Sequence, residues 1–96
     1  MSSIHRALRA AQDILDLAKY IADENPAAAN RVLDAIDGKL NVLVAHPELG
    51  VKRDDLAAGV RSSLVGNYVL YYRPHESGIE LLRVLHAACD ISALFQ

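Results

Sequence analysis

Two arginines and a histidine in the second half of the chain have the side chains best suited to chemistry. Arg61 and Arg83 carry guanidinium groups, which can bind a phosphate through two parallel hydrogen bonds, and His86 adds an imidazole. Cleavage of RNA by its own 2′-hydroxyl needs a general base, a general acid and cations that stabilise the charged intermediate. One interpretation of these three residues is therefore a catalytic site acting on RNA.

The same residues also have a structural interpretation, which we favour. Arg83 lies within a strongly apolar run, so we expect it to be partly buried and paired. Both arginines would then pair with internal carboxylates or backbone carbonyls, and His86 would bond to backbone at the end of a strand. The last residues, 90–96, contain no Tyr, Lys, Arg or His that could supply an acid or base.

The second half of the chain predicts three consecutive β-strands. The expected strands are Val60 to Val65, Tyr68 to Arg73 and Ile79 to His86. Gly66-Asn67 predicts a tight hairpin between the first two, because glycine readily adopts a positive φ. On the middle strand Tyr68 and Tyr72 share one face and Tyr71 takes the other. Such tyrosines can stack on bases, although packing in a core or interface is the commoner role.

The first half predicts two helices joined at Asn25-Pro26. Apolar residues recur at helical spacing up to Ala22, and the residue before a proline disfavours the helical conformation. Asn25 can cap the second helix, which we expect to end near His46-Pro47. The predicted fold class is α+β, with a small antiparallel β-sheet packed against this N-terminal helical hairpin.

Three smaller segments complete the prediction. A short strand is possible from Ser3 to Arg6, and residues 46–59 are expected to be irregular because Pro47, Gly50 and Gly59 interrupt them. Asp90 can cap a short helical turn that contains Leu94 and Phe95.

Composition limits the functional classes. The 96 residues, 52% of them apolar, predict one globular domain over residues 1–96. A net charge of −2 lacks the basic surplus typical of direct DNA binding. The single cysteine fits a reducing, cytoplasmic location, and no apolar run is long enough for a membrane span. No spacing predicts a metal site, and no glycine motif predicts a nucleotide cofactor.

The order of several short motifs resembles the ParE-type toxins of the ParE/RelE superfamily of bacterial toxin–antitoxin modules. The matching pieces are Asp13-Ile14 with Tyr20-Ile21-Ala22, Asn25-Pro26, Pro47-Glu48-Leu49-Gly50 with Arg53, Gly59-Val60-Arg61, Val65-Gly66-Asn67-Tyr68, Tyr72-Arg73-Pro74 and Arg83-Val84-Leu85-His86. The chain departs from the family pattern at Ala87 and Cys89, and at Cys89 the family usually has arginine.

This resemblance implies the toxin of a type II toxin–antitoxin module, neutralised by a ParD-like antitoxin and acting on DNA gyrase by binding rather than catalysis. The alternative is a RelE-like endoribonuclease that cuts mRNA on the ribosome with Arg61, Arg83 and His86. A third possibility is a weakened copy, because Cys89 replaces the family arginine. The candidate target- and antitoxin-binding residues are Arg61, Tyr68, Arg73, Arg83, His86, Cys89, Asp90, Leu94 and Phe95. We also expect the isolated chain to expose an apolar groove.

Overall fold

The structure, a computed structural model, describes residues 3–89. The predicted turn at Asp90 and the candidate site residues Leu94 and Phe95 lie outside the described residues. The elements follow in the order β1 (Ser3–Arg6), α1 (Leu8–Glu24), α2 (Pro26–Ala45), the short 3₁₀ helix η1 (Pro47–Leu49), β2 (Val51–Lys52), β3 (Arg61–Val65), β4 (Tyr68–His75) and β5 (Gly78–His86).

The helical hairpin forms as its sequence predicts. α1 ends at Glu24, and the side chain of Asn25 caps α2 by accepting a hydrogen bond of 3.1 Å from the Ala28 N–H. Pro26 occupies the first turn of α2, where a missing N–H costs nothing. α2 ends at Ala45, directly before His46-Pro47. Among the described residues, neither helix combines the length and the apolar character needed to cross a bilayer.

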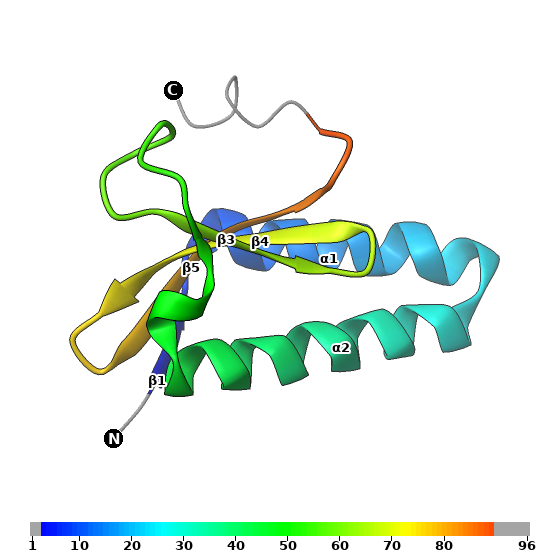
Figure 1. Cartoon of the computed structure of the whole chain (residues 1–96). Helices are drawn as coiled ribbons and strands as arrows, with labels where there is room; N and C mark the ends of the chain where they lie inside the picture. Colours follow the sequence, from blue (N-terminus) through cyan, green and yellow to red (C-terminus); the bar gives the residue numbers. More distant parts are fainter. Residues whose placement is uncertain (1–2, 90–96) are drawn as a thin grey trace.

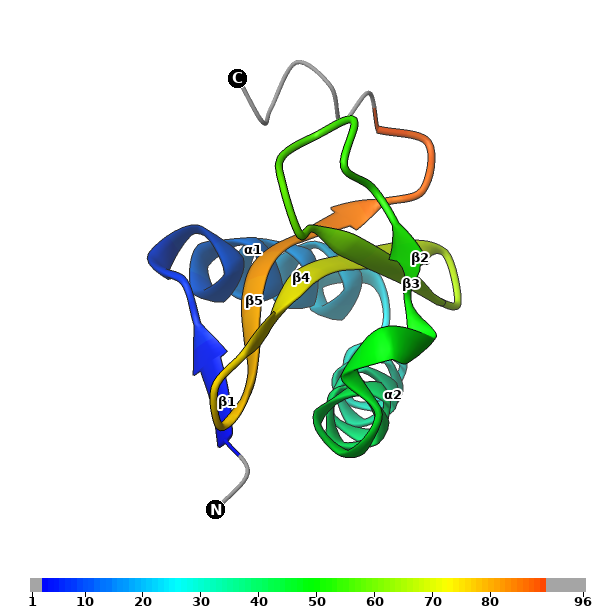
Figure 2. The same ribbon diagram turned by 60° about the vertical axis from the view of Figure 1, so that its left-hand side comes forward.

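The strands form one five-stranded sheet in the order β1-β5-β4-β3-β2 (Figures 1 and 2). Gly66 takes a φ of 57° in the turn between β3 and β4, which confirms the predicted hairpin. The fold class is confirmed, with one difference from the predicted antiparallel sheet: β1 pairs parallel with β5, so the sheet is mixed. Parallel pairing is possible here because α1 and α2 separate β1 from the other strands in sequence.

The segment 46–59 is more regular than predicted. It contains η1 and the edge strand β2, which pairs antiparallel with β3. Tyr72 stabilises this regular structure. Its buried hydroxyl accepts a hydrogen bond from the Gly50 N–H and donates one to the Pro47 carbonyl, both at 2.8 Å. Burial raises the pKa of this hydroxyl above its ordinary value, against the lowering effect of the Gly50 hydrogen bond.

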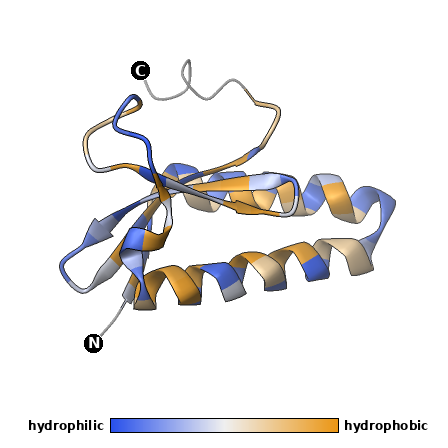
Figure 3. Ribbon diagram, in the orientation of Figure 1, coloured by the Kyte–Doolittle hydropathy of each residue, from blue (hydrophilic) through white to orange (hydrophobic). Residues whose placement is uncertain are grey.

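The core lies on both faces of the sheet. Both helices pack on one face, where the larger cluster includes Leu40, Leu70 and Tyr72 (Figure 2). The second face carries a smaller cluster built on Val60 and Tyr71 and partly covered by Leu56. Tyr72 and Tyr71 therefore face opposite sides, as predicted. Apolar and polar residues alternate along both helices in Figure 3.

Candidate functional site

Arg83 forms an ion pair with Asp13 inside the fold. Its Nε and Nη2 donate to the Asp13 carboxylate of α1 at 2.7 and 3.1 Å, and that carboxylate also accepts from the Val84 N–H at 3.0 Å. The two side chains are only 12% and 13% exposed. The hydrogen bonds to Asp13 raise the pKa of Arg83, and they outweigh the opposite effect of burial. The prediction that Arg83 is partly buried and paired is confirmed.

A β-bulge shapes the strand at this ion pair. In the register between β4 and β5, Tyr71 lies opposite Arg83 while the next residue, Tyr72, lies opposite Leu81. One residue of β5 is therefore skipped, which breaks the regular alternation of side chains. Arg83 and Val84 follow the skipped residue, and their hydrogen bonds to the Asp13 carboxylate connect β5 to α1.

Arg61 is also held by internal partners, at a different place. Its Nη1 donates to the carbonyls of Glu48 and Gly50 at 3.0 and 2.8 Å. These contacts fix η1 and the start of β2 against β3. Backbone carbonyls were one of the two kinds of partner predicted for Arg61, so this pairing is confirmed as well. Arg61 and Arg83 do not share a partner, since one binds η1 and the other α1.

The remaining candidate residues occupy separate positions. Arg73 forms an exposed ion pair with Glu80 at 2.8 Å. His86 accepts a hydrogen bond of 3.1 Å from the Ala88 N–H through Nδ1, as expected for a histidine at the end of a strand. The ring of His86 packs edge-on against Tyr68, with centroids 5.5 Å apart. Cys89 is exposed and has a free thiol.

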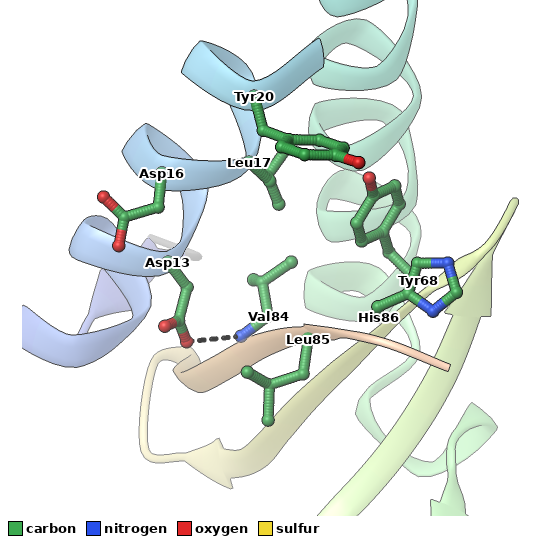
Figure 4. Close-up of a pocket in the computed structure, with 8 residues that line it drawn as sticks. All are labelled: Asp13, Asp16, Leu17, Tyr20, Tyr68, Val84, Leu85 and His86. Carbon is green, nitrogen blue, oxygen red and sulfur yellow. Dashed lines mark hydrogen bonds between the residues drawn. The ribbon is translucent and has the colours of Figure 1, made fainter. Parts of the chain in front are cut away.

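A groove opens between α1 and the paired ends of β4 and β5 (Figure 4). Its volume is about 510 Å³. We name it the α1–β5 groove. Beside Asp13, it is lined by Asp16, Leu17, Tyr20, Tyr68, Val84 and His86. Leu17 and Val84 supply an apolar floor, because both belong to the helix-side core. The expected apolar groove is therefore present.

The groove brings together only part of the predicted site. Tyr68 and His86 line it, whereas Arg61 and Arg73 bond to residues elsewhere in the fold. Sequence reasoning missed Asp16 and Tyr20, although their spacing of four residues places them on one side of α1. Within residues 3–89, no group of His, Cys, Asp and Glu side chains is arranged to hold a metal ion.

The chain thus combines a small mixed sheet, a helical hairpin on one face of that sheet and an open groove beside α1. The family described as "ParE toxin of type II toxin-antitoxin system, parDE" matches residues 4–91. The chain therefore belongs to the ParE toxin family.

Two further proteins are similar to the chain. The toxin RelE3 of Caulobacter vibrioides is 27% identical over 88 residues, which are 91% of this chain and 96% of that toxin. A solved structure of the chromosomal ParDE TA system from P. aeruginosa aligns with a TM-score of 0.72 at 21% identity, covering 90% of this chain and 96% of that one. At this identity the structural match shows a shared fold.

Proposed function

We propose that this ParE-family toxin acts by binding DNA gyrase, without catalysis, and that a ParD-like antitoxin restrains it by occupying the α1–β5 groove. The family description supports the toxin role, and the solved structure with the same fold comes from a ParDE system. The groove suits a partner segment, because apolar side chains form its floor and polar groups its walls.

The internal partners of Arg61 and of Arg83 are the observation that favours binding over catalysis. An RNase needs cations that face the phosphate as charge develops on it. Here one guanidinium bonds to Asp13 and the other to two backbone carbonyls, at distances of 2.7 to 3.1 Å. Opening these contacts to bind RNA would leave Asp13 or the carbonyls without those partners, at a cost of about 1–3 kcal/mol for each buried group.

We assign the proposed gyrase-binding surface to Cys89 at the end of the described chain and to residues that follow it in sequence. Cys89 is exposed just after β5, and Asp90, Leu94 and Phe95 follow it in sequence. Arg73 supplies an exposed cation elsewhere on the sheet. This assignment keeps the gyrase-binding residues of the tail distinct from the antitoxin groove.

Induction of the toxin in cells without antitoxin tests the target. We expect DNA damage that depends on gyrase, and we expect no cuts in mRNA at ribosomal A-site codons when message is mapped by primer extension. Cuts that disappear in an Arg61→Ala variant whose circular dichroism matches the wild type would favour the RelE-like endoribonuclease instead. The variant needs that folding control because Arg61 holds η1 and β2 in place.

A further inference from the structure

The face of the sheet opposite the helices carries a row of apolar side chains that is only partly covered. Leu64 of β3 lies opposite Val69 of β4, and Val69 lies opposite Leu85 of β5. Residues that lie opposite each other in neighbouring strands share a face of the sheet. Leu64 is 60% exposed, and Val69 and Leu85 are only partly buried against the second-face cluster. We name these three residues the second-face row.

The second-face row is distinct from the α1–β5 groove. Figure 4 shows the side chain of Val84 pointing toward α1 and that of Leu85 pointing the other way. Leu56, from the loop between β2 and β3, packs on the same face as the row. The buried members of the cluster there are Val60 and Tyr71, with exposures of 1% and 5%. Within residues 3–89, the row itself therefore lacks a comparable cover.

The described chain ends close to this row. The Ala87 N–H donates to the Asn67 carbonyl at 2.8 Å, in the turn that joins β3 and β4. The Cys89 N–H then donates to the His86 carbonyl at 2.9 Å, which closes a further turn. Figures 1 and 2 both show the chain after β5 rising on the side of the sheet away from α2, where the loop between β2 and β3 also lies. The seven residues that follow Cys89 are therefore attached beside the second face.

Residues 90–96 have the length and the side chains to cover the row. Ile91, Leu94 and Phe95 are spaced so that one helical turn would place them on the same side. Seven residues span about 23–25 Å when extended and about 10 Å as a helix. The row crosses three strands, which lie about 4.8 Å apart. The segment is thus long enough to cross the row in either conformation.

Charge and attachment favour this segment over a separate partner. All three side chains of the row are aliphatic, and Asp90 carries the only ionisable side chain of residues 90–96. Packing the apolar side chains of the segment on the row therefore removes no charged side chain from water. Because the segment belongs to the same chain, its effective concentration at the row is roughly millimolar, which exceeds that of most free partners.

We propose that residues 90–96 fold back onto the sheet and cover the second-face row with Ile91, Leu94 and Phe95. The consequence of this docking rests on the proposed function, in which Leu94 and Phe95 contact gyrase. While the segment is docked, these two side chains face the toxin's own sheet, so gyrase binds only toxin whose segment is released. Docking thus lowers the apparent affinity for gyrase in proportion to the docked fraction.

A tryptophan placed in the segment reports docking, because the chain contains no other. The purified full-length Phe95→Trp toxin is compared with a synthetic peptide of residues 90–96 that carries the same substitution. The emission of the toxin should be blue-shifted, and its iodide quenching constant should be about threefold or more below that of the peptide, because a docked ring is shielded from water. Equal quenching of toxin and peptide would overturn docking. Quenching that falls as toxin concentration rises would also overturn it, since a second chain would then cover the ring.

Two aspartate substitutions of equally exposed leucines locate the docking site. Leu64→Asp, made in the Phe95→Trp toxin, places a charge in the second-face row and should raise the quenching constant to that of the peptide. The control is Leu49→Asp, because Leu49 is also 60% exposed but lies in η1, which Tyr72 holds on the helix side of the sheet. The control should leave quenching unchanged. Release of the segment by both variants, or by neither, would overturn the proposed site.

A third variant keeps the test valid if Leu64→Asp fails to fold, which circular dichroism would reveal. Ile91→Asp changes the segment and none of residues 3–89, and it should raise the quenching constant in the same way. A tryptophan that stays protected in Ile91→Asp would contradict the predicted packing of the segment.

Growth inhibition without antitoxin separates this inference from the proposed function. At matched expression, Leu64→Asp should be more toxic than Leu49→Asp, because more of the segment is free to bind gyrase. If Leu64→Asp releases the segment in the quenching experiment but toxicity does not change, docking is confirmed and the assignment of residues 90–96 to gyrase binding is wrong.

Discussion

Breaking the ion pair between Asp13 and Arg83 should destabilise the fold severely. Asp13→Asn removes the negative charge but keeps an oxygen that can accept from the Val84 N–H, so the variant isolates the loss of the ion pair. Arg83→Met removes the cation and keeps an apolar stem of similar length. Each single change leaves a poorly exposed charge without its partner.

The expected magnitude follows from the burial of the pair. The two side chains are 12% and 13% exposed, so the pair is not fully buried. Removing one partner should therefore lower the free energy of unfolding by about 3 kcal/mol, the lower end of the range for buried ion pairs. That is a large share of a total stability of about 5–15 kcal/mol. The double variant should lose less than the sum of the single changes, by about 1–3 kcal/mol, because no unpaired charge remains.

Urea unfolding followed by circular dichroism measures these differences. With a slope of about 1–2 kcal/mol per molar urea, each single change should lower the midpoint by about 1.5–3 M. The matched control is Arg73→Met, which breaks an ion pair to Glu80 whose side chains are 48% and 20% exposed, and which should cost at most about 1 kcal/mol. Midpoints of both single variants within the error of the wild type would show that Arg83 is not required for folding and would reopen its catalytic interpretation.

Three further predictions concern other parts of the chain. Tyr72→Phe should cost about 1–3 kcal/mol in urea unfolding, because it removes the hydrogen-bond partners of Gly50 and Pro47. Burial raises the folded-state pKa of Tyr72, so the contribution of this side chain to the free energy of unfolding is complete below the ordinary value of 10.0 and is lost as the pH rises through the folded-state pKa. Above pH 10.0 the stability of the wild type should therefore fall more steeply than that of Tyr72→Phe. Parallel stability curves for the two proteins would contradict this. Cys89→Arg should raise toxicity without altering folding, since the position is exposed and the family usually has arginine there. Equal plating efficiencies of the two toxins, at matched expression and without antitoxin, would show that residue 89 does not determine toxicity. Deletion of residues 90–96 should abolish growth inhibition but keep the antitoxin Kd, and a large loss of antitoxin binding would show that the tail braces the fold instead.

The sequence was most informative where a local rule determines structure. Asn25-Pro26 predicted the junction of the two helices, and Gly66-Asn67 predicted the hairpin, because caps and tight turns depend on a few adjacent residues. The apolar strand around Arg83 predicted its pairing in the same local way. These elements needed no information about distant parts of the chain.

Long-range pairings could not be predicted from the sequence. Asp13 lies 70 residues before its partner Arg83, and nothing in the spacing selects it from the other acidic residues. β1 has four residues with one strong β-former, so its parallel pairing with β5 becomes visible only when α1 and α2 are placed. β2 was missed because it has two residues and depends on the contacts of Tyr72 and Arg61.

The sequence was also unable to predict the full set of residues that line the α1–β5 groove. Tyr68 and His86 were candidates from the sequence, but Asp16 and Tyr20 join them only because α1 runs beside the ends of β4 and β5. The Asp13 carboxylate fixes that position by bonding to both Arg83 and the Val84 N–H. The arrangement of the groove therefore depends on the ion pair between Asp13 and Arg83, which the sequence did not predict.

Supercoiling by purified DNA gyrase tests the central proposal most directly. Wild-type toxin should inhibit the reaction or trap cleaved DNA, and toxin already bound to its antitoxin should do neither. Unimpaired supercoiling at toxin concentrations that stop growth, together with mRNA cut in a translating extract, would contradict the account.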